Sequence, residues 1–276
     1  MDIYEKTKRF YESFQGNKTI IGKSVLQRDI YAVKIGDGSP TGIAQYAIHG
    51  REFITAELAF LHAKIGLKKG SFWLIPLANP DGALLSEVGL DSVEKNGDKT
   101  RLIALNNGER DFSLWKANAR GVDLNVNFPA KWGKGVKNTR FAGAENYVGE
   151  KPFSEPETRA LKRFSEKIRP DYTLSYHTKG EEIYWYFYQS ERYRLRDKKL
   201  AHVLSEVTGY PLAEAKGSAG GYKDWCIRRL KIPAFTIETG SDLLQHPIRE
   251  EGLENILTKN KNALSALSDA FETDKS

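Results

Sequence analysis

Three side chains with the chemistry of zinc ligands follow short apolar runs of this sequence. His49 directly follows the strand-like run 42–48, and Glu52 comes three residues later, in the first turn of the helix predicted next. His177 directly follows another apolar run, 172–176. Residues spaced i and i+3 lie on one side of a helical turn, and a helix N-terminus favours the ionised carboxylate that a metal needs. Two histidines and one carboxylate leave one zinc position open, as catalytic sites do.

A further carboxylate, Glu238, ends a third apolar run, 234–237. In an open α/β sheet, ligands bind beyond the carboxyl ends of the strands. We therefore expect Glu238 to converge with His49 and His177 at that edge. A carboxylate beside the metal that is not needed as a ligand has the chemistry of a general base. A salt bridge at the strand end is the alternative interpretation of Glu238.

Five motifs occur in the order found in zinc carboxypeptidases. Between about residue 20 and about residue 250 the chain resembles the carboxypeptidase A superfamily, in which a His₂Glu zinc site is known. The resemblance implies one Zn²⁺ ion on His49, Glu52 and His177. A lone His-x-x-Glu motif would be weak evidence, whereas five motifs in order are specific. They are His49-Gly50-Arg51-Glu52, Asn79-Pro80-Asp81-Gly82, Gly121-Val122-Asp123-Leu124-Asn125, His177 and Glu238.

Two stretches narrow the resemblance to one branch of the superfamily. Residues 115–118, Trp-Lys-Ala-Asn, and residues 177–185, which begin at His177, resemble the bacterial γ-D-glutamyl-meso-diaminopimelate peptidases. Members of that branch cut stem peptides of the cell wall. The resemblance therefore implies a muropeptide or another small peptide as substrate.

The resemblance also implies a role for each residue near the metal. Zinc would supply a water of lowered pKa and polarise the scissile carbonyl, while Glu238 takes the proton of that water and passes it to the leaving amine. Asp123 matches the aspartate that orients His49. Lys116 stands where relatives carry an arginine that stabilises the oxyanion, and Arg120 is the competing candidate.

The chain departs from carboxypeptidase A after Asn125. Relatives that remove C-terminal residues follow this asparagine with an arginine that clamps the terminal carboxylate, whereas this chain has Val126, which cannot bind a carboxylate. Asn125 retains the capacity for a polar contact with substrate. Tyr222 is the candidate for the tyrosine that covers the site in those relatives, with a packing role as the alternative.

Recognition of substrate must then come from other groups. Diaminopimelate carries an extra amine and an extra carboxylate, which Arg120 and the Glu181–Glu182 pair could bind by opposite charge, although surface charge is the simpler interpretation of each. Three functions stay open. The first is a γ-D-glutamyl-diaminopimelate peptidase, the second an ordinary carboxypeptidase on α-linked peptides, which Val126 disfavours, and the third a catalytically silent peptide-binding protein.

Strand-like and helix-like segments alternate along the chain, which predicts an α/β fold. We expect a single domain over residues 1–276, with a mixed twisted β-sheet flanked by helices on both faces, because no Pro/Ser-rich linker divides the chain. The predicted strands are 19–25, 30–35, 42–48, 72–77, 172–176, 183–187 and 234–237.

Helices are predicted from apolar periodicity and from capping residues. An amphipathic helix begins near the N-terminus, and others are expected over 53–65, from a capping box at Ser154 to Pro170, and as one final helix over 253–271. Two further segments, 87–111 and 129–153, are predicted to be irregular. The second is rich in glycine and contains Trp132, Phe141 and Tyr147, which suggests a flexible aromatic wall beside the site, with plain surface loops as the alternative.

Composition excludes several classes of protein. The formal charge of +6 is spread along the chain, and no basic-aromatic cluster indicates nucleic-acid binding. The single cysteine, Cys226, cannot form an intrachain disulfide and is expected to be buried. No apolar stretch is long enough to span a bilayer, and the N-terminal residues lack the apolar core of a signal peptide. These features favour a cytoplasmic protein without a membrane partner, with a secreted protein trimmed of its leader as the alternative. The oligomeric state is left open.

Overall fold

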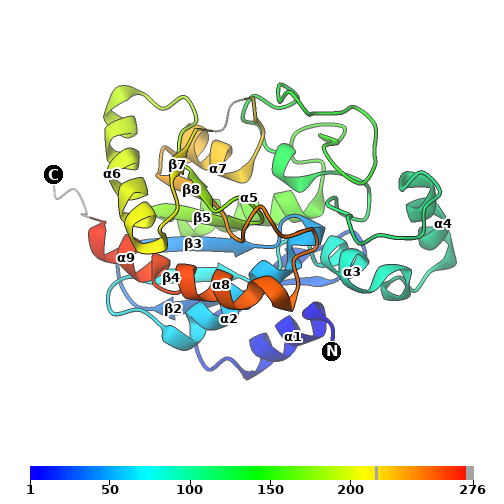
Figure 1. The fold of residues 1–276 in the computed structure, drawn as a ribbon, viewed down its shortest axis with the longest axis horizontal. Coiled ribbons are helices and arrows are strands. Elements are labelled where there is room, and N and C mark those ends of the chain that lie inside the picture. The colour runs from blue at the N-terminus through cyan, green and yellow to red at the C-terminus, as the bar shows by residue number, and fades with distance from the viewer. Residues whose placement is uncertain (215–216, 272–276) are drawn as a thin grey trace.

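The computed structural model describes residues 1–214 and 217–271, which are organised around one sheet of eight strands. Figure 1 shows how the helices and strands are arranged. The strands lie side by side in the order β1-β2-β4-β3-β5-β8-β6-β7. The central strands β4, β3, β5 and β8 are parallel. On one side β2 pairs antiparallel with β4 and with the edge strand β1. On the other side β6 pairs antiparallel with β8 and parallel with the edge strand β7. The strands are β1 (Lys18–Lys23), β2 (Asp29–Gly36), β3 (Thr41–Tyr46), β4 (Ser71–Ile75), β5 (Tyr172–His177), β6 (Glu182–Tyr184), β7 (Leu212–Ala213) and β8 (Ala234–Glu238).

Helices cover both faces of this sheet, which confirms the predicted fold class. On one face, α2, α6, α8 and α9 share a core with the sheet, and on the other α5 and α7 share a second core. Helix α1 packs on α3 and on β2 at one end. The helices are α1 (Ile3–Ser13), α2 (Ala56–Ile65), α3 (Pro80–Val88), α4 (Asn96–Leu105), α5 (Pro156–Ile168), α6 (Glu191–Thr208), α7 (Tyr222–Trp225), α8 (Glu250–Asn260) and α9 (Ala263–Ala270).

The central strands are buried on both faces, which is why they read as continuous apolar runs in the sequence. Every residue of β5 is buried, and only the last residue of β8 is partly exposed. The edge strand β1 instead alternates between exposed and half-buried residues. Because β3, β5 and β8 are parallel, their carboxyl ends meet at one edge of the sheet.

The strand β3 is shorter than predicted. It ends at Tyr46, and Ala47 adopts the left-handed conformation with φ of 50°, so that the chain turns before His49. The segment after the turn is also different, because Gly50–Thr55 forms a 3₁₀ helix, η1, before α2 begins at Ala56. The two-residue strand β7 was not predicted, since it has no periodicity long enough to detect.

Three predictions about helices were wrong. The segment 87–111 contains the 3₁₀ helix η2 (Gly89–Ser92) and the polar helix α4, in which only Leu102 is buried and no amphipathic stripe marks the helix. The final helix is two helices, because the chain breaks between α8 and α9. The capping box at Ser154 does not form, since α5 begins one residue later with Glu155 as its N-cap and without a capping hydrogen bond from that side chain.

The expectations for the N-terminal helix and for Cys226 are confirmed. The N-terminal helix forms as α1, and Cys226 is fully buried, where burial raises the pKa of its thiol to about 12. In the part of the chain that the structure describes, no helix combines the length and apolar character that crossing a membrane requires.

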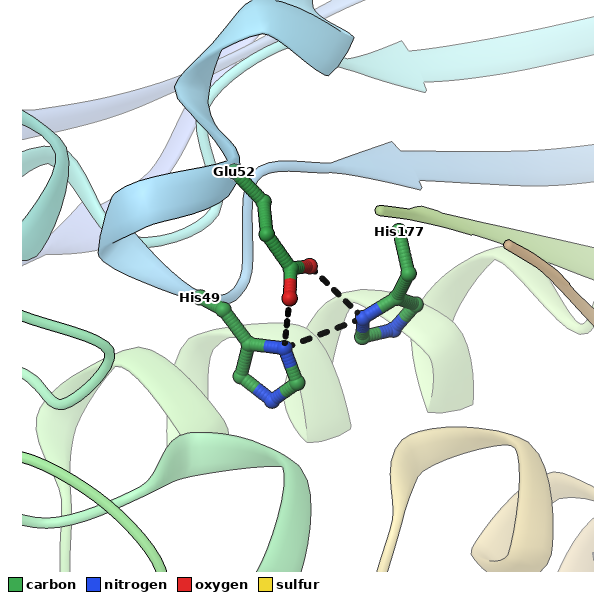
Figure 2. Close-up of side chains that lie close together, drawn as sticks. All are labelled: His49, Glu52 and His177. Atoms are coloured by element: carbon green, nitrogen blue, oxygen red, sulfur yellow. Dashed lines mark hydrogen bonds and ion pairs between the residues drawn. The ribbon is translucent and has the colours of Figure 1, made fainter. Parts of the chain in front are cut away.

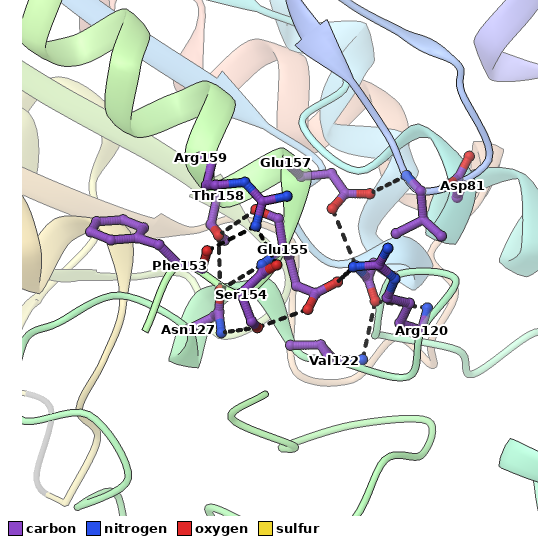
Figure 3. Close-up of polar contacts among 12 residues, drawn as sticks. Asp81, Arg120, Val122, Asn127, Phe153, Ser154, Glu155, Glu157, Thr158 and Arg159 are labelled. Carbon is purple, nitrogen blue, oxygen red and sulfur yellow. Dashed lines mark hydrogen bonds and ion pairs between the residues drawn. The ribbon is translucent and has the colours of Figure 1, made fainter. Parts of the chain in front are cut away.

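Two buried acidic side chains lie at the start of α5, Glu155 and Glu157 (Figure 3). They bind Asn118, which lies in the loop that carries Lys116 and Asp123. The Asn118 amide Nδ2 donates to Glu155 Oε2 at 2.8 Å and to Glu157 Oε2 at 3.2 Å. Glu157 Oε1 also accepts the backbone N–H of Val25 at 3.0 Å. Burial, aided by the negative charge of Asp81, raises the pKa of Glu157 to about 8.

This raised pKa predicts a pH dependence of stability. The folded protein keeps the Glu157 proton between its ordinary pKa of 4.5 and about 8, whereas the unfolded chain loses it. The contribution of Glu157 to the free energy of unfolding is therefore fully present below pH 4.5 and is lost as the pH rises through about 8. The free energy of unfolding falls by no more than about 1.4 kcal/mol per pH unit from this cause. The free energy of unfolding, measured in urea at pH 6 and pH 8, should fall less in Glu157→Gln than in the parent. An equal fall in both proteins would contradict the assignment.

Candidate metal centre

His49, Glu52 and His177 form a compact cluster of potential ligands in the described part of the chain (Figure 2). His49 lies after the turn that ends β3, Glu52 lies in η1, and His177 is the last residue of β5. Glu52 Oε1 is 2.9 Å from His49 Nδ1, and Glu52 Oε2 is 2.9 Å from His177 Nδ1. The two Nδ1 atoms are 3.1 Å apart, and all three side chains are buried.

This donor set fits a zinc ion. Two imidazole nitrogens cannot both point protons at each other across 3.1 Å, whereas both can direct lone pairs at one cation. Ligand atoms about 2.0 to 2.2 Å from a tetrahedral zinc lie roughly 3.3 to 3.6 Å from one another, only slightly farther apart than these donors. Nitrogen and carboxylate ligands are also those that zinc prefers. The three residues predicted as ligands are therefore placed together as a zinc site requires.

Charge favours the ionised carboxylate in this cluster. Burial by itself would raise the pKa of Glu52, but the adjacent His49 and His177 lower that pKa well below its ordinary value. Glu52 is consequently an anion at neutral pH, which is the form that binds a metal.

Asp123 links the cluster to Lys116. Its Oδ1 lies 3.3 Å from His49 Nε2, within ion-pair distance but without the alignment of a hydrogen bond, and its Oδ2 lies 2.8 Å from the Lys116 Nζ. Burial would raise the pKa of Asp123, yet Lys116 and His49 lower it. Burial would likewise lower the pKa of Lys116, but Asp123 raises it. An ionised Asp123 therefore faces the outer nitrogen of His49, as expected for the residue that orients this ligand.

Close backbone packing holds His49 in place. A side chain at Gly50 would meet Gly82 O at 2.4 Å and Trp115 O at 2.6 Å, so only glycine fits between these segments. The Gly50 N–H donates to Lys116 O at 2.9 Å. The Asn79 amide Nδ2 donates to Ile48 O at 3.2 Å and also to the loop that carries Lys116. The motifs at 49–52, 79–82 and 121–125 are thus parts of one packed unit.

Glu238 ends β8 directly beside His177, its partner in the register of β5 and β8. Its side chain keeps some exposure to the adjoining cavity. Burial raises the pKa of Glu238 to about 7, against the lowering effect of His177. The structure therefore places this carboxylate next to the metal ligands but outside their cluster, which is the position that a base requires.

A cavity of about 460 Å³ opens beside these residues, a volume typical of sites for small ligands. His49, Lys116, Asn125, Val126 and Glu238 contribute to its wall. Further lining residues come from the loop 135–146, from Tyr184 and Thr236, and from the segment 217–224.

Three residues predicted to bind substrate lie elsewhere. Tyr222 is the first residue of α7 and is fully buried, with its hydroxyl 2.7 Å from Ser165 Oγ, so it cannot cover the site. Arg120 is half-exposed and its Nη1 lies 3.7 Å from Glu155 Oε2, away from the cavity wall. Glu181 pairs with Lys259 at 2.9 Å and does not line the cavity either. Tyr222 therefore has a packing role, and Arg120 and Glu181 carry surface charges, as the alternative interpretations of these residues had it.

The loop 129–153 contributes to the cavity, but not as an aromatic wall. Gly135, Val136, Lys137, Asn138 and Asn146 line it, and the aromatic residues of the loop do not. Two charged residues in the wall, Lys223 and Asp224, were not predicted from the sequence. Adjacent charges beside a tryptophan read as an exposed helix turn, and nothing in their spacing indicates burial.

Comparison with known proteins identifies the family. The sequence profile described as zinc carboxypeptidase matches residues 12–261. The chain belongs to the zinc carboxypeptidase family. The family's name specifies zinc, and the His-Glu-His cluster provides the donors that could hold it.

Two relatives of this chain are named as different kinds of enzyme, an endopeptidase and an amidase. The chain is 35% identical over 269 residues to the γ-D-glutamyl-L-diamino acid endopeptidase 1 of Lysinibacillus sphaericus, covering 91% of this chain and 66% of that protein. It is 35% identical over 120 residues to the murein peptide amidase A of Escherichia coli K12, covering 40% of this chain and 46% of that protein. The chain thus spans less than two thirds of the length of both proteins.

A solved structure shares the whole fold. Bovine thrombin-activatable fibrinolysis inhibitor, in complex with tick carboxypeptidase inhibitor, superposes with a TM-score of 0.75 at 18% identity, covering 98% of this chain and 96% of that chain. At this identity the likeness concerns the fold alone. The fold is therefore shared with that structure over nearly the full length of this chain.

Removal of one ligand should abolish metal binding. We expect the parent to retain about one zinc per chain after dialysis and His177→Ala to retain almost none, because two protein donors do not form a stable zinc site. Mass spectrometry of the metal content measures this, with His202→Ala as the control, since His202 is exposed on α6. Full zinc retention by His177→Ala would refute the assigned ligand set.

Filling the space at Gly50 should disturb both stability and metal binding. Gly50→Ala forces the backbone segments apart and should lower the free energy of unfolding by about 1 to 3 kcal/mol. Its zinc affinity should fall as well, because His49 moves with Gly50. Gly97→Ala is the matched control, since Gly97 lies in α4 with open space around it, and it should stabilise the helix by about 0.5 to 1 kcal/mol. Equal thermal stability of the two variants would contradict the packing argument.

Proposed function

We propose that this chain is a zinc-dependent peptidase that hydrolyses the γ-D-glutamyl-meso-diaminopimelate bond of peptidoglycan stem peptides. The observation that carries the proposal is the convergence of His49, Glu52 and His177 with the free carboxylate of Glu238 at one end of a cavity. All the groups that hydrolysis needs lie there, which disfavours a catalytically silent binding protein.

The choice of substrate rests on the cavity wall and on the relatives. Val126 lines the cavity at the position where carboxypeptidase A-type enzymes clamp a terminal carboxylate, and its apolar side chain offers no charge or donor. This disfavours ordinary removal of C-terminal residues. Two relatives are named for γ-D-glutamyl-diamino acid and murein peptide bonds, which favours a stem peptide as substrate.

The residues of the chain divide the chemistry between them. When bound, zinc supplies an activated water and polarises the scissile carbonyl. Glu238 accepts the proton of the attacking water as the new carbon–oxygen bond forms. It then delivers that proton to the nitrogen of the leaving amine, and the carbon–nitrogen bond of the amide breaks. Lys116 presents an ammonium group in the cavity wall, where it stabilises the negative charge that develops on the carbonyl oxygen. Asp123 holds Lys116 and faces His49, so it orients both.

The proposal predicts release of diaminopimelate from L-Ala-γ-D-Glu-meso-diaminopimelate. The zinc-loaded protein should cleave this tripeptide, and Glu238→Gln should reduce kcat roughly 10²- to 10⁴-fold, because the proton acceptor is lost. Products are identified by mass spectrometry. Zinc content of the variant is measured in parallel, so that lost metal is not mistaken for a lost base.

An α-linked peptide of the same length serves as the competing substrate. If the γ-linked tripeptide stays intact while the α-linked peptide loses its last residue, the protein is an ordinary carboxypeptidase. If the zinc-loaded protein cuts neither peptide, the result favours a catalytically silent peptide-binding protein.

A further inference from the structure

A lysine–aspartate pair lies in the wall of the same cavity and takes no part in the proposed hydrolysis. Lys223 and Asp224 belong to α7, and both line the cavity. They are almost completely buried, with 6% of Lys223 and 4% of Asp224 exposed. Burying two charges is costly unless they gain partners, so a buried pair that faces a cavity requires an explanation.

The described residues satisfy this pair only in part. The Lys223 Nζ donates to Asp224 Oδ1 at 2.7 Å and to Tyr186 O at 3.2 Å, which uses two of the three donors of an ammonium group. Asp224 Oδ2 accepts the Gly221 N–H at 3.1 Å, and a carboxylate offers about four acceptor positions. The Lys223 Nζ also lies 5.3 Å from the centre of the Phe187 ring, a contact that supplies no hydrogen-bond acceptor. Each ion therefore keeps capacity for one more charged partner, and both residues line the cavity.

The sign and spacing of the pair define that partner. A ligand carrying only a carboxylate would be attracted by Lys223 but repelled by Asp224. A ligand carrying only an ammonium would be attracted by Asp224 but repelled by Lys223. A group with both charges on one carbon satisfies both ions at once, its carboxylate toward Lys223 and its ammonium toward Asp224. The zwitterionic head of an α-amino acid has this arrangement.

The neighbouring groups support such a head group. Asn125, Tyr184 and Thr236, which also line the cavity, are neutral and offer hydrogen bonds. The other lining charges either belong to the hydrolytic centre or, like Lys137 and Glu214, are exposed. Among the described residues of the wall, Lys223 and Asp224 are thus the buried opposite charges that lie apart from that centre.

We propose that Lys223 and Asp224 bind the zwitterionic amino-acid head at the far end of the diaminopimelate side chain, and that they select this residue over lysine. This inference rests on the proposed function, because the diaminopimelate must lie beyond the scissile bond for its side chain to enter the cavity. In meso-diaminopimelate the side chain ends in an ammonium and a carboxylate on one carbon, whereas lysine ends in an ammonium alone.

The test compares kcat/KM for two tripeptides, L-Ala-γ-D-Glu-meso-diaminopimelate and L-Ala-γ-D-Glu-L-Lys. The parent should prefer the first, and Lys223→Met should reduce this preference roughly 10- to 100-fold, as expected for a lost hydrogen bond between charged groups. Asp224→Asn is the second variant. It keeps an oxygen to accept the Gly221 N–H, and it should lower kcat/KM for both peptides because each carries the distal ammonium.

Lys167→Met controls for the loss of a lysine, since Lys167 is exposed on α5, and it should keep the parent's preference. Circular dichroism and zinc content establish that each variant is folded and loaded. A parent without preference, or folded variants that both keep the parent's kcat/KM values, would overturn the subsite.

Binding of the free amino acids separates this inference from the proposed function. If the parent cleaves neither tripeptide, the proposed hydrolysis fails, and calorimetry with meso-diaminopimelate and with L-lysine then decides the subsite. Binding of meso-diaminopimelate that is weakened by Lys223→Met supports it. Absence of binding to the zinc-loaded parent overturns it.

Discussion

The site depends on the close approach of three backbone segments around Gly50. His49 can lie near Glu52 and Asp123 only because the carbonyl oxygens of Gly82 and Trp115 pack directly against the Cα atom of Gly50. Hydrogen bonds from Gly50 and Asn79 tie these segments together. Interiors packed at this density transmit small displacements, so the positions of Lys116 and Asp123 are coupled to that of His49.

The parallel centre of the sheet supplies the second half of the site. Because β5 and β8 run in the same direction and in register, His177 and Glu238 end side by side. One of them becomes a ligand and the other stays outside the cluster. A rigid buried strand pair of this kind holds reacting groups more precisely than loops do.

Groups of opposite charge alternate around the cluster. Glu52 lies between two imidazoles, Asp123 lies between His49 and Lys116, and the acidic residues at the start of α5 bind Asn118 in the same loop. Each buried charge thus has an opposite charge or a donor nearby, which offsets its cost of desolvation. The Lys223–Asp224 pair follows the same rule but keeps part of its capacity toward the cavity.

The sequence by itself determined the residues with chemistry and most of the sheet. Apolar runs long enough to fill buried strands predicted β2, β3, β5 and β8, and polar residues after three of them predicted the cluster at one edge. Where local pattern is weak, prediction failed: α4 is polar, and the final helix breaks without a glycine or proline. Only the tertiary structure decided which side chains face the cavity. Tyr222 and Arg120 point away from it, while Lys223 and Asp224 enter its wall. The reason is physical, because the direction of a side chain on an irregular loop or a single helical turn is set by packing between segments distant in the chain, and no local periodicity records that packing.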